Sequence, residues 1–216
     1  MKHLRQLLGL TAFVLAAVAG SVYAEPVDFT IDPAHTQATF TIRHYFTKVS
    51  GRFNELVGKI VYDEKNLLAS SVDVTILAKS VFTANERRDA DLRSQNFFWA
   101  DSFPALTFKS TKVVPGEGKK FKVEGNLTMR GVTKLVVLDS ELLGVGPANV
   151  TGSPLRLVAG FEGTTMVNRK DFNIVWNRAL DQGGTLLGDD VSIHLTVEAK
   201  AEPKGDKPAA AAKTDK

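Results

Sequence analysis

The sequence predicts an all-β protein, an eight-stranded antiparallel barrel with one short helix packed at the barrel. Three features predict this class. Apolar and polar residues alternate along several segments, which is the period of a half-buried strand. Clusters of Gly, Pro and Asp separate these segments and are typical of tight turns. One charged, helix-like stretch, from about Thr83 to Ser94, interrupts the strands and runs into several large aromatic residues.

Residues 1–24 have the pattern of a secretory signal peptide. A basic start precedes an apolar run from Leu7 to Val18, and small residues flank Tyr23 ahead of Glu25. The apolar run is too short for a membrane-spanning helix. We therefore expect cleavage after Ala24 and a mature protein that works in the periplasm or is secreted.

Composition narrows the class of partner. The chain has no cysteine, so the fold does not use disulfides. The formal charge of +3 comes from the two ends, because residues 25–199 hold twenty basic and twenty-one acidic residues. A body this close to neutral gives no basic face, and no nucleic-acid partner is expected. Residues 201–216 are rich in Lys, Ala and Pro, which predicts a disordered tail after a single domain at 25–200.

The strands follow from the alternation, taken along the chain. The segments with the clearest alternation are 38–44, 71–78, 121–129 and 191–199, and weaker runs occupy 59–63, 105–111, 135–142 and 157–166. Gly51 and Gly58 suggest bulges or bends in the second strand region. Seven or eight antiparallel strands joined by short turns are typical of a sandwich or a barrel. A barrel is favoured because each strand has one apolar and one polar face and closure removes the exposed edges.

The helix-like segment has its own signals. Thr83 and Glu86 match a capping box, so the helix is expected to begin near Thr83. Asp89 and Asp91 are two positions apart and point in different directions, which excludes a paired-carboxylate site. Pro104 ends any helix. The aromatics between are too large to leave in water, so this segment should fold onto the barrel; they are Phe97, Phe98, Trp99 and Phe103.

An ordered set of motifs extends over nearly the whole body. These motifs are Ile31-Asp32-Pro33-Ala34-His35 with Phe40 and His44, Gly51-x-Phe53 with Gly58, Asn85 through Phe98, Phe103-Pro104 with Phe108, Gly125 through Lys134, Arg169-x-Asp171-Phe172, and Gly188-Asp189-x-Val191. Each is weak alone, but the ordered set resembles the YceI-like, polyisoprenoid-binding family. The resemblance implies an extended lipocalin-like barrel, a periplasmic location, and a long apolar lumen that holds an isoprenoid lipid or the isoprenoid tail of a quinone.

The chain departs from the family pattern at three positions. Asp91 stands where a histidine is common, and Trp99 stands where an acidic residue is common. Asn173 stands where a glycine often follows the Asp-Phe pair. Because asparagine tolerates a left-handed backbone better than most residues, the turn at Asn173 should survive.

We expect a lipid-binding protein for transport or storage, with no catalytic residue, no metal and no cofactor beyond the bound isoprenoid lipid or quinone. The helix and its aromatics are expected to form one wall of the lumen, or a movable closure through which ligand enters. His44 is either a hydrogen-bonded core residue or a contact for a ligand headgroup. The candidate lumen residues are Phe40, Ile42, His44, Val74, Ile76, Phe97, Phe98, Trp99, Phe108, Phe121, Val123, Leu127 and Phe161.

Other interpretations stay open at this point. A hydrolase could use His35 or His44, although no GxSxG-type nucleophile elbow is present. A filled barrel would be a structural or partner-binding protein without ligand. The mature chain has no HxH or HExxH spacing, which disfavours a metal. Arg88 and Arg169 are expected in structural ion pairs, for instance with Asp89, Asp171 or Asp32. Transient contact with a membrane surface and a homodimer are both compatible with the sequence.

Overall fold

The structure is a computed structural model that describes residues 25–148 and 156–202. The predicted signal peptide and the tail from residue 203 onward lie outside the described residues. The strands are β1 Val27–Ile31, β2 Gln37–His44, β3 Thr47–Phe53, β4 Leu56–Tyr62, β5 Ser71–Leu77, β6 Val81–Phe82, β7 Ala105–Pro115, β8 Lys120–Met129, β9 Val132–Ala148, β10 Arg156–Asn168 and β11 Leu187–Ala201. The helices are α1 Glu86–Arg93 and the 3₁₀ turns η1 Leu67–Ala69, η2 Ala78–Ser80 and η3 Arg169–Phe172.

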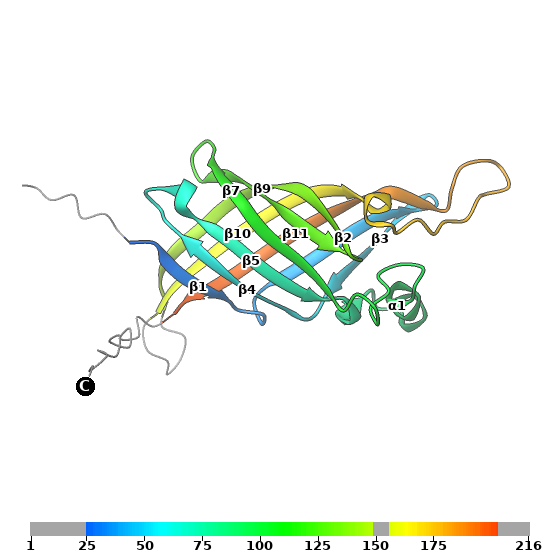
Figure 1. Ribbon diagram of the computed structural model, residues 1–216, viewed down its shortest axis with the longest axis horizontal. Helices are drawn as coiled ribbons and strands as arrows, with labels where there is room; N and C mark the ends of the chain where they lie inside the picture. Colours follow the sequence, from blue (N-terminus) through cyan, green and yellow to red (C-terminus); the bar gives the residue numbers. More distant parts are fainter. Residues whose placement is uncertain (1–24, 149–155, 203–216) are drawn as a thin grey trace, which may run out of the picture.

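Within the described residues, eight strands form a closed antiparallel ring. Their order is β1-β4-β5-β7-β8-β9-β10-β11, and β1 also pairs with β11, which closes the circle. The strands β2, β3 and β6 lengthen one end, because β2 continues along β11 beyond β1 while β3 and β6 add to β2 in turn. The result is the elongated barrel of Figure 1, with α1 at one end. The predicted fold class is confirmed.

Buried apolar side chains gather in two clusters rather than one. The helix-end cluster consists of Phe53, Ala78, Val81, Phe97, Ala100, Leu106, Met129, Val136, Val167, Phe172, Ile174 and Leu187. The far-end cluster consists of Phe29, Ile31, Ala38, Leu56, Ile60, Tyr62, Ala159, Phe161 and Ala199. Ile76 packs against both. Inward residues such as Phe40 and Leu195 stay only partly buried, so the barrel interior is not packed along its whole length.

The helix begins later than the capping box predicts. Asn85 caps α1, since its side chain accepts a hydrogen bond from the Arg88 N–H. Thr83 is instead buried, and its N–H and hydroxyl both donate to the Asp89 carboxylate. The Arg88 guanidinium donates to the Thr83 hydroxyl and carbonyl. Because Thr83 bonds to Asp89 and Arg88, it does not cap the helix. Asp89 is only 4% exposed and so does not lie on a solvated face.

Gly51 and Gly58 do not mark bulges, because both lie in unbroken ladders with β2 and β5. Gly51 makes room for a ring. A Cβ added there would lie 2.5 Å from the Cζ of Phe40 and 2.7 Å from the Cγ2 of Thr83. The missing side chain lets the Phe40 ring lie across β3 inside the barrel.

Gly51→Ala is therefore expected to lower the free energy of unfolding by about 1–3 kcal/mol, the usual cost of overpacking a well-filled site. Urea denaturation measures the loss. Gly160→Ala is the matched control, because the nearest atom to a Cβ there is 3.6 Å away; its stability should change by less than about 0.5 kcal/mol. Equal stability of the two variants would contradict the close approach of Phe40.

Candidate binding cavity

The barrel interior contains a cavity of about 730 Å³. Its wall is built mainly from apolar side chains of the strands and from the segment around α1. The volume falls in the range of about 300–1,000 Å³ that is typical of small-molecule sites. The partly buried inward residues described above are the side chains that face this space. A cavity of this size favours a hollow barrel over a filled one.

Twelve of the thirteen predicted lumen residues lie on the wall of this cavity. They are Phe40, Ile42, His44, Val74, Ile76, Phe97, Phe98, Phe108, Phe121, Val123, Leu127 and Phe161. The alternation of the strands placed most of them, since a one-residue change of face would have moved those that lie on strands to the outside. Whether they contact a ligand stays a prediction.

Trp99 is the one predicted residue that does not line the cavity. Its backbone is left-handed, with φ 49°, and its side chain is 38% exposed. The ring packs edge-on against Phe103, and the Arg130 guanidinium lies 5.8 Å from its centre. The turn that follows α1 therefore sends Phe97 and Phe98 inward and Trp99 outward.

Part of the cavity wall is formed by residues that are not among the predicted lumen residues. Val191, Ile193, Leu195 and Val197 of β11 line the cavity, and the alternation of that strand is the signal that identifies them. Ile174 and Trp176 also line it, from an irregular segment between η3 and β11. Trp176 packs against Phe97 with ring centres 5.5 Å apart. No periodic signal marks that segment, so only the tertiary fold identifies it.

Arg169 holds this irregular segment against the barrel. The side chain is 3% exposed, and its guanidinium donates to the carbonyls of Gly188, Ile174 and Trp176 and to the Asp189 carboxylate. Burial lowers the pKa of this guanidinium, and the nearby Asp189 opposes that effect. The ion pair was predicted, but its partner is Asp189 rather than Asp171 or Asp32.

The turn next to Arg169 behaves as the sequence predicts. Asn173 ends η3 in a left-handed conformation with φ 59°. Its N–H donates to the carbonyl of Lys170. Asparagine thus supplies the backbone conformation for which a glycine is common at this position.

One polar part of the wall lies at the helix end. Asn85, Arg87, Arg88 and Asp91 line the cavity from α1 and its cap, and His44 lines it from the end of β2. Arg88 is held by Thr83 rather than by an ion pair with Asp89. Arg87 and Asp91 are exposed. These groups are placed where a polar end of a ligand would meet the apolar interior.

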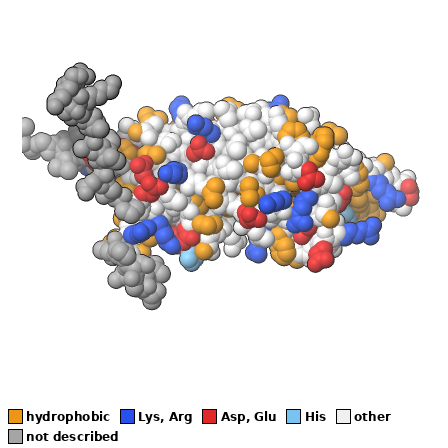
Figure 2. All heavy atoms as spheres, turned by 60° about the horizontal axis from the view of Figure 1, so that its bottom comes forward, with side chains coloured by type: hydrophobic (Ala, Val, Ile, Leu, Met, Phe, Trp, Pro, Cys, Tyr) orange, Lys and Arg blue, Asp and Glu red, His pale blue; other side chains and the backbone are white. Residues whose placement is uncertain are grey.

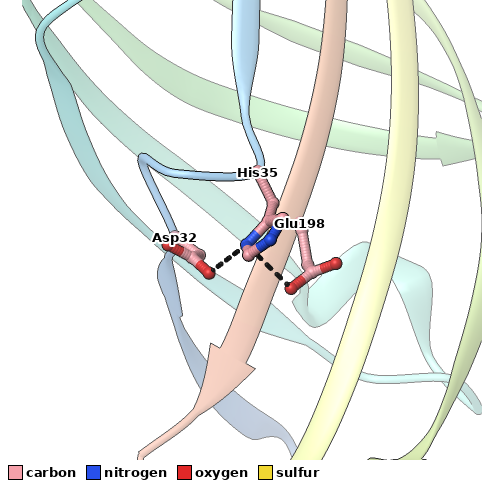
Figure 3. A group of neighbouring side chains, drawn as sticks. All are labelled: Asp32, His35 and Glu198. Atoms are coloured by element: carbon pink, nitrogen blue, oxygen red, sulfur yellow. Dashed lines mark hydrogen bonds and ion pairs between the residues drawn. The ribbon is translucent and has the colours of Figure 1, made fainter. Parts of the chain in front are cut away.

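A second group of polar side chains ties β1, β2 and β11 together, outside the cavity wall (Figure 3). The His35 Nδ1 lies 2.7 Å from Asp32 Oδ2 and 3.6 Å from Glu198 Oε1. These three ligand atoms lie within 4.8 Å of one another, as in a cation site. Lys200, however, donates to the same Asp32 oxygen at 2.5 Å. The Lys200 ammonium group is therefore already bound to the oxygen that a metal ion would need, so these side chains form a charge network within the protein.

This network makes stability depend on pH. The hydrogen bonds from Lys200 and His35 lower the pKa of Asp32 from 3.8 to about 2. A lowered pKa in the folded state contributes stability that is complete above about pH 4 and is lost as the pH falls toward 2. Asp32→Asn should therefore be less stable than wild type by on the order of 1 kcal/mol at pH 6, after allowance for solvent screening.

Urea denaturation between pH 2 and pH 6 checks this prediction, and the difference between the two proteins should shrink toward zero near the lower limit. Asp139→Asn is the control, because it breaks an exposed pair with Lys122 that is worth less than about 1 kcal/mol. A pH-independent difference for Asp32→Asn would contradict the assignment.

Comparisons with known proteins agree with this architecture. A model of the YceI-like domain matches residues 29–199. A UPF0312 protein of Yersinia enterocolitica is 40% identical over 171 residues, which cover 79% of this chain and 86% of the relative. A UPF0312 protein of Staphylococcus aureus is 34% identical over 172 residues, with 79% and 96% covered. Among the described residues, no helix has the length and apolar character needed to cross a bilayer.

Solved structures show the same barrel. The YCEI protein of Campylobacter jejuni superimposes with a TM-score of 0.63 at 31% identity, over 74% of this chain and 90% of that one. A polyisoprenoid binding domain from Saccharophagus degradans has a TM-score of 0.58 at 15% identity, with 82% and 99% covered, and shares the fold. The domain match and the curated relatives together show that this chain belongs to the YceI-like family.

Proposed function

We propose that this protein binds an isoprenoid lipid, or the isoprenoid tail of a quinone, inside its barrel and carries or stores it. The observation that carries the proposal is the apolar cavity of about 730 Å³. The Saccharophagus structure that shares the fold is described as a polyisoprenoid binding domain. That description belongs to the other protein, but it names a ligand class whose shape and polarity suit the cavity of this one.

The energetics favour a hydrocarbon ligand. Each five-carbon isoprene unit contributes roughly 3–4 kcal/mol of gross burial energy before the cost of ordering the chain. A few units therefore give tight binding without a charged contact. In this proposal the tail lies between Phe40 and Phe121, and the headgroup sits near His44 and α1, whose charged side chains line that end of the cavity.

The same geometry supports binding rather than catalysis. Hydrolysis by a serine-type mechanism needs a histidine bonded to a nucleophilic hydroxyl. His35 bonds to Asp32, and His194 bonds to Glu162 at 2.6 Å. His44 lines the cavity, where an apolar pocket uses such a group to orient a ligand.

The proposed location is the periplasm. The proposal rests on the signal-like segment at 1–24. Amino-terminal sequencing of protein from the cell envelope tests this, since cleavage after Ala24 leaves Glu25 as the first residue. A start at residue 1 on the purified protein would contradict it.

Extraction of the purified protein into organic solvent, followed by mass spectrometry, tests the ligand. One isoprenoid lipid per barrel is the expected result. Protein that repeatedly yields no lipid, even after incubation with isoprenoid quinones, would overturn the proposal. Turnover of ester or peptide substrates that disappears in His35→Ala or His44→Ala would favour the hydrolase instead.

A further inference from the structure

The hairpin between β2 and β3 carries two aromatic residues that the fold does not use. Phe46 is 85% exposed and Tyr45 is 44% exposed, and their ring centres lie 3.8 Å apart. Leaving a phenylalanine in water forgoes the burial energy that most large apolar side chains gain. An apolar pair held this far out of the core indicates a contact with something outside the described chain.

The backbone presents this pair in a strained form. Tyr45 has φ 55°, a left-handed conformation that is unusual for a bulky residue. The Tyr45 N–H donates to the Leu186 carbonyl at 2.7 Å, and Arg43 donates to the carbonyls of Tyr45 and Thr185. These hydrogen bonds hold the aromatic turn in place. Strain that the surroundings maintain is a feature of functional sites.

Charge accompanies the aromatics. We define the aromatic tip as residues 43–48 together with residues 177–186, the segment that Tyr45 contacts. The tip holds Arg43, Lys48 and Arg178, against Asp181 as its single acidic residue. Arg43 and Lys48 are directly opposite on the outer face of β2 and β3, and within the described chain none of these three cations has an ion pair.

The aromatic tip lies beside the cavity. His44 precedes Tyr45 in the chain and lines the cavity, as does Leu186, whose carbonyl holds the Tyr45 N–H. In Figure 1 the ends of β2 and β3 and the loop before β11 form one end of the barrel. Figure 2 shows basic and hydrophobic side chains next to each other at that end.

We propose that the aromatic tip docks on the surface of an anionic lipid bilayer. Aromatic rings at the headgroup level and basic residues around them are what such a surface recognises. Docking would bring the helix end of the cavity to the membrane, where an isoprenoid lipid is drawn in or released. This role rests on the proposed lipid-binding function, although the docking surface itself is defined by the tip alone.

Co-sedimentation with vesicles tests the docking. Wild type should bind vesicles of phosphatidylcholine and phosphatidylglycerol more tightly than vesicles of phosphatidylcholine alone, and added salt should weaken the binding. Phe46→Ser should bind about tenfold more weakly to both, because the buried ring is lost. Lys48→Glu should bind about tenfold more weakly to the anionic vesicles only.

Leu135→Ser is the matched control, since Leu135 is 64% exposed on β9, a strand that is not part of the tip; it should bind like wild type. Equal binding by Phe46→Ser and wild type, or no binding by wild type, overturns the docking. The docking is also overturned if Phe46→Ser changes the oligomeric state of the protein and leaves vesicle binding unchanged. That result would make the tip an interface between copies of the chain.

Measuring the lipid content of the same preparations tests the docking separately from the proposed lipid binding in the lumen. Phe46→Ser should still take up an isoprenoid quinone from detergent micelles at wild-type stoichiometry, while uptake from anionic vesicles slows about tenfold. Vesicle binding by a protein whose barrel takes up no lipid from micelles would leave the docking standing and overturn the lumen function.

Discussion

Phe121→Asp is expected to abolish retention of an isoprenoid lipid while leaving a barrel that still folds. Phe121 lines the cavity from β8 and is partly buried, with its ring edge-on to Phe161. A carboxylate on this wall must either remain charged against a hydrocarbon chain or take up a proton, and both cost several kcal/mol. We expect the affinity for lipid to fall by at least about a hundredfold, which corresponds to about 3 kcal/mol.

The loss is measured by extraction and mass spectrometry, or by titration of the delipidated protein with an isoprenoid quinone. Leu135→Asp is the control because it places the same charge on the outer face of the neighbouring β9. It should retain lipid at wild-type stoichiometry. Retention by a correctly folded Phe121→Asp protein would show that this face of β8 does not meet the ligand.

Arg169→Ala should be the most destabilising single substitution proposed here, at about 3–5 kcal/mol. It removes the donors that satisfy the carbonyls of Ile174, Trp176 and Gly188 and leaves these groups without partners in a buried place. The irregular segment that carries Ile174 and Trp176 should then detach from the cavity wall. Urea denaturation and the emission of Trp176 report the two effects.

Two neighbouring variants make this prediction specific. Lys170→Ala removes an exposed partner of the same Asp189 and should cost less than about 1 kcal/mol. Arg169→Lys keeps the charge but lacks the planar fork that reaches several carbonyls at once, so it should rescue little stability. Full rescue by lysine would mean that charge alone, and not the hydrogen bonds, holds the segment.

The strands and the face that lines the cavity could be predicted because a period of two is a local property. Phe40 and Ile42 on β2, or Val123 and Leu127 on β8, need only their neighbours in sequence to be assigned to one side. Closure of the barrel also followed, since unpaired edges are unfavourable in any sheet of this kind.

The errors lie where contacts or backbone conformations that form only in the folded chain decide the outcome. The capping box at Thr83 is a correct local pattern, but Asp89 binds that threonine and Asn85 takes the cap. Arg169 finds a partner twenty positions along the chain in Asp189. Trp99 turns outward because of a left-handed backbone that apolar periodicity does not encode.

The hollow interior could not be predicted either. The same inward phenylalanines would fill a narrower barrel, and alternation carries no information about volume. In the structure the packed residues form a helix-end cluster and a far-end cluster. Phe40 packs against the first, Phe121 packs against the second, and both line the cavity.

A crystal structure of the protein grown with a long-chain isoprenoid quinone tests this open lumen most directly. We predict continuous density for the hydrocarbon tail between Phe40 and Phe121, with the quinone ring near His44. Phenylalanine side chains that meet across an empty axis, with the quinone absent or bound only on the outer surface, would contradict it.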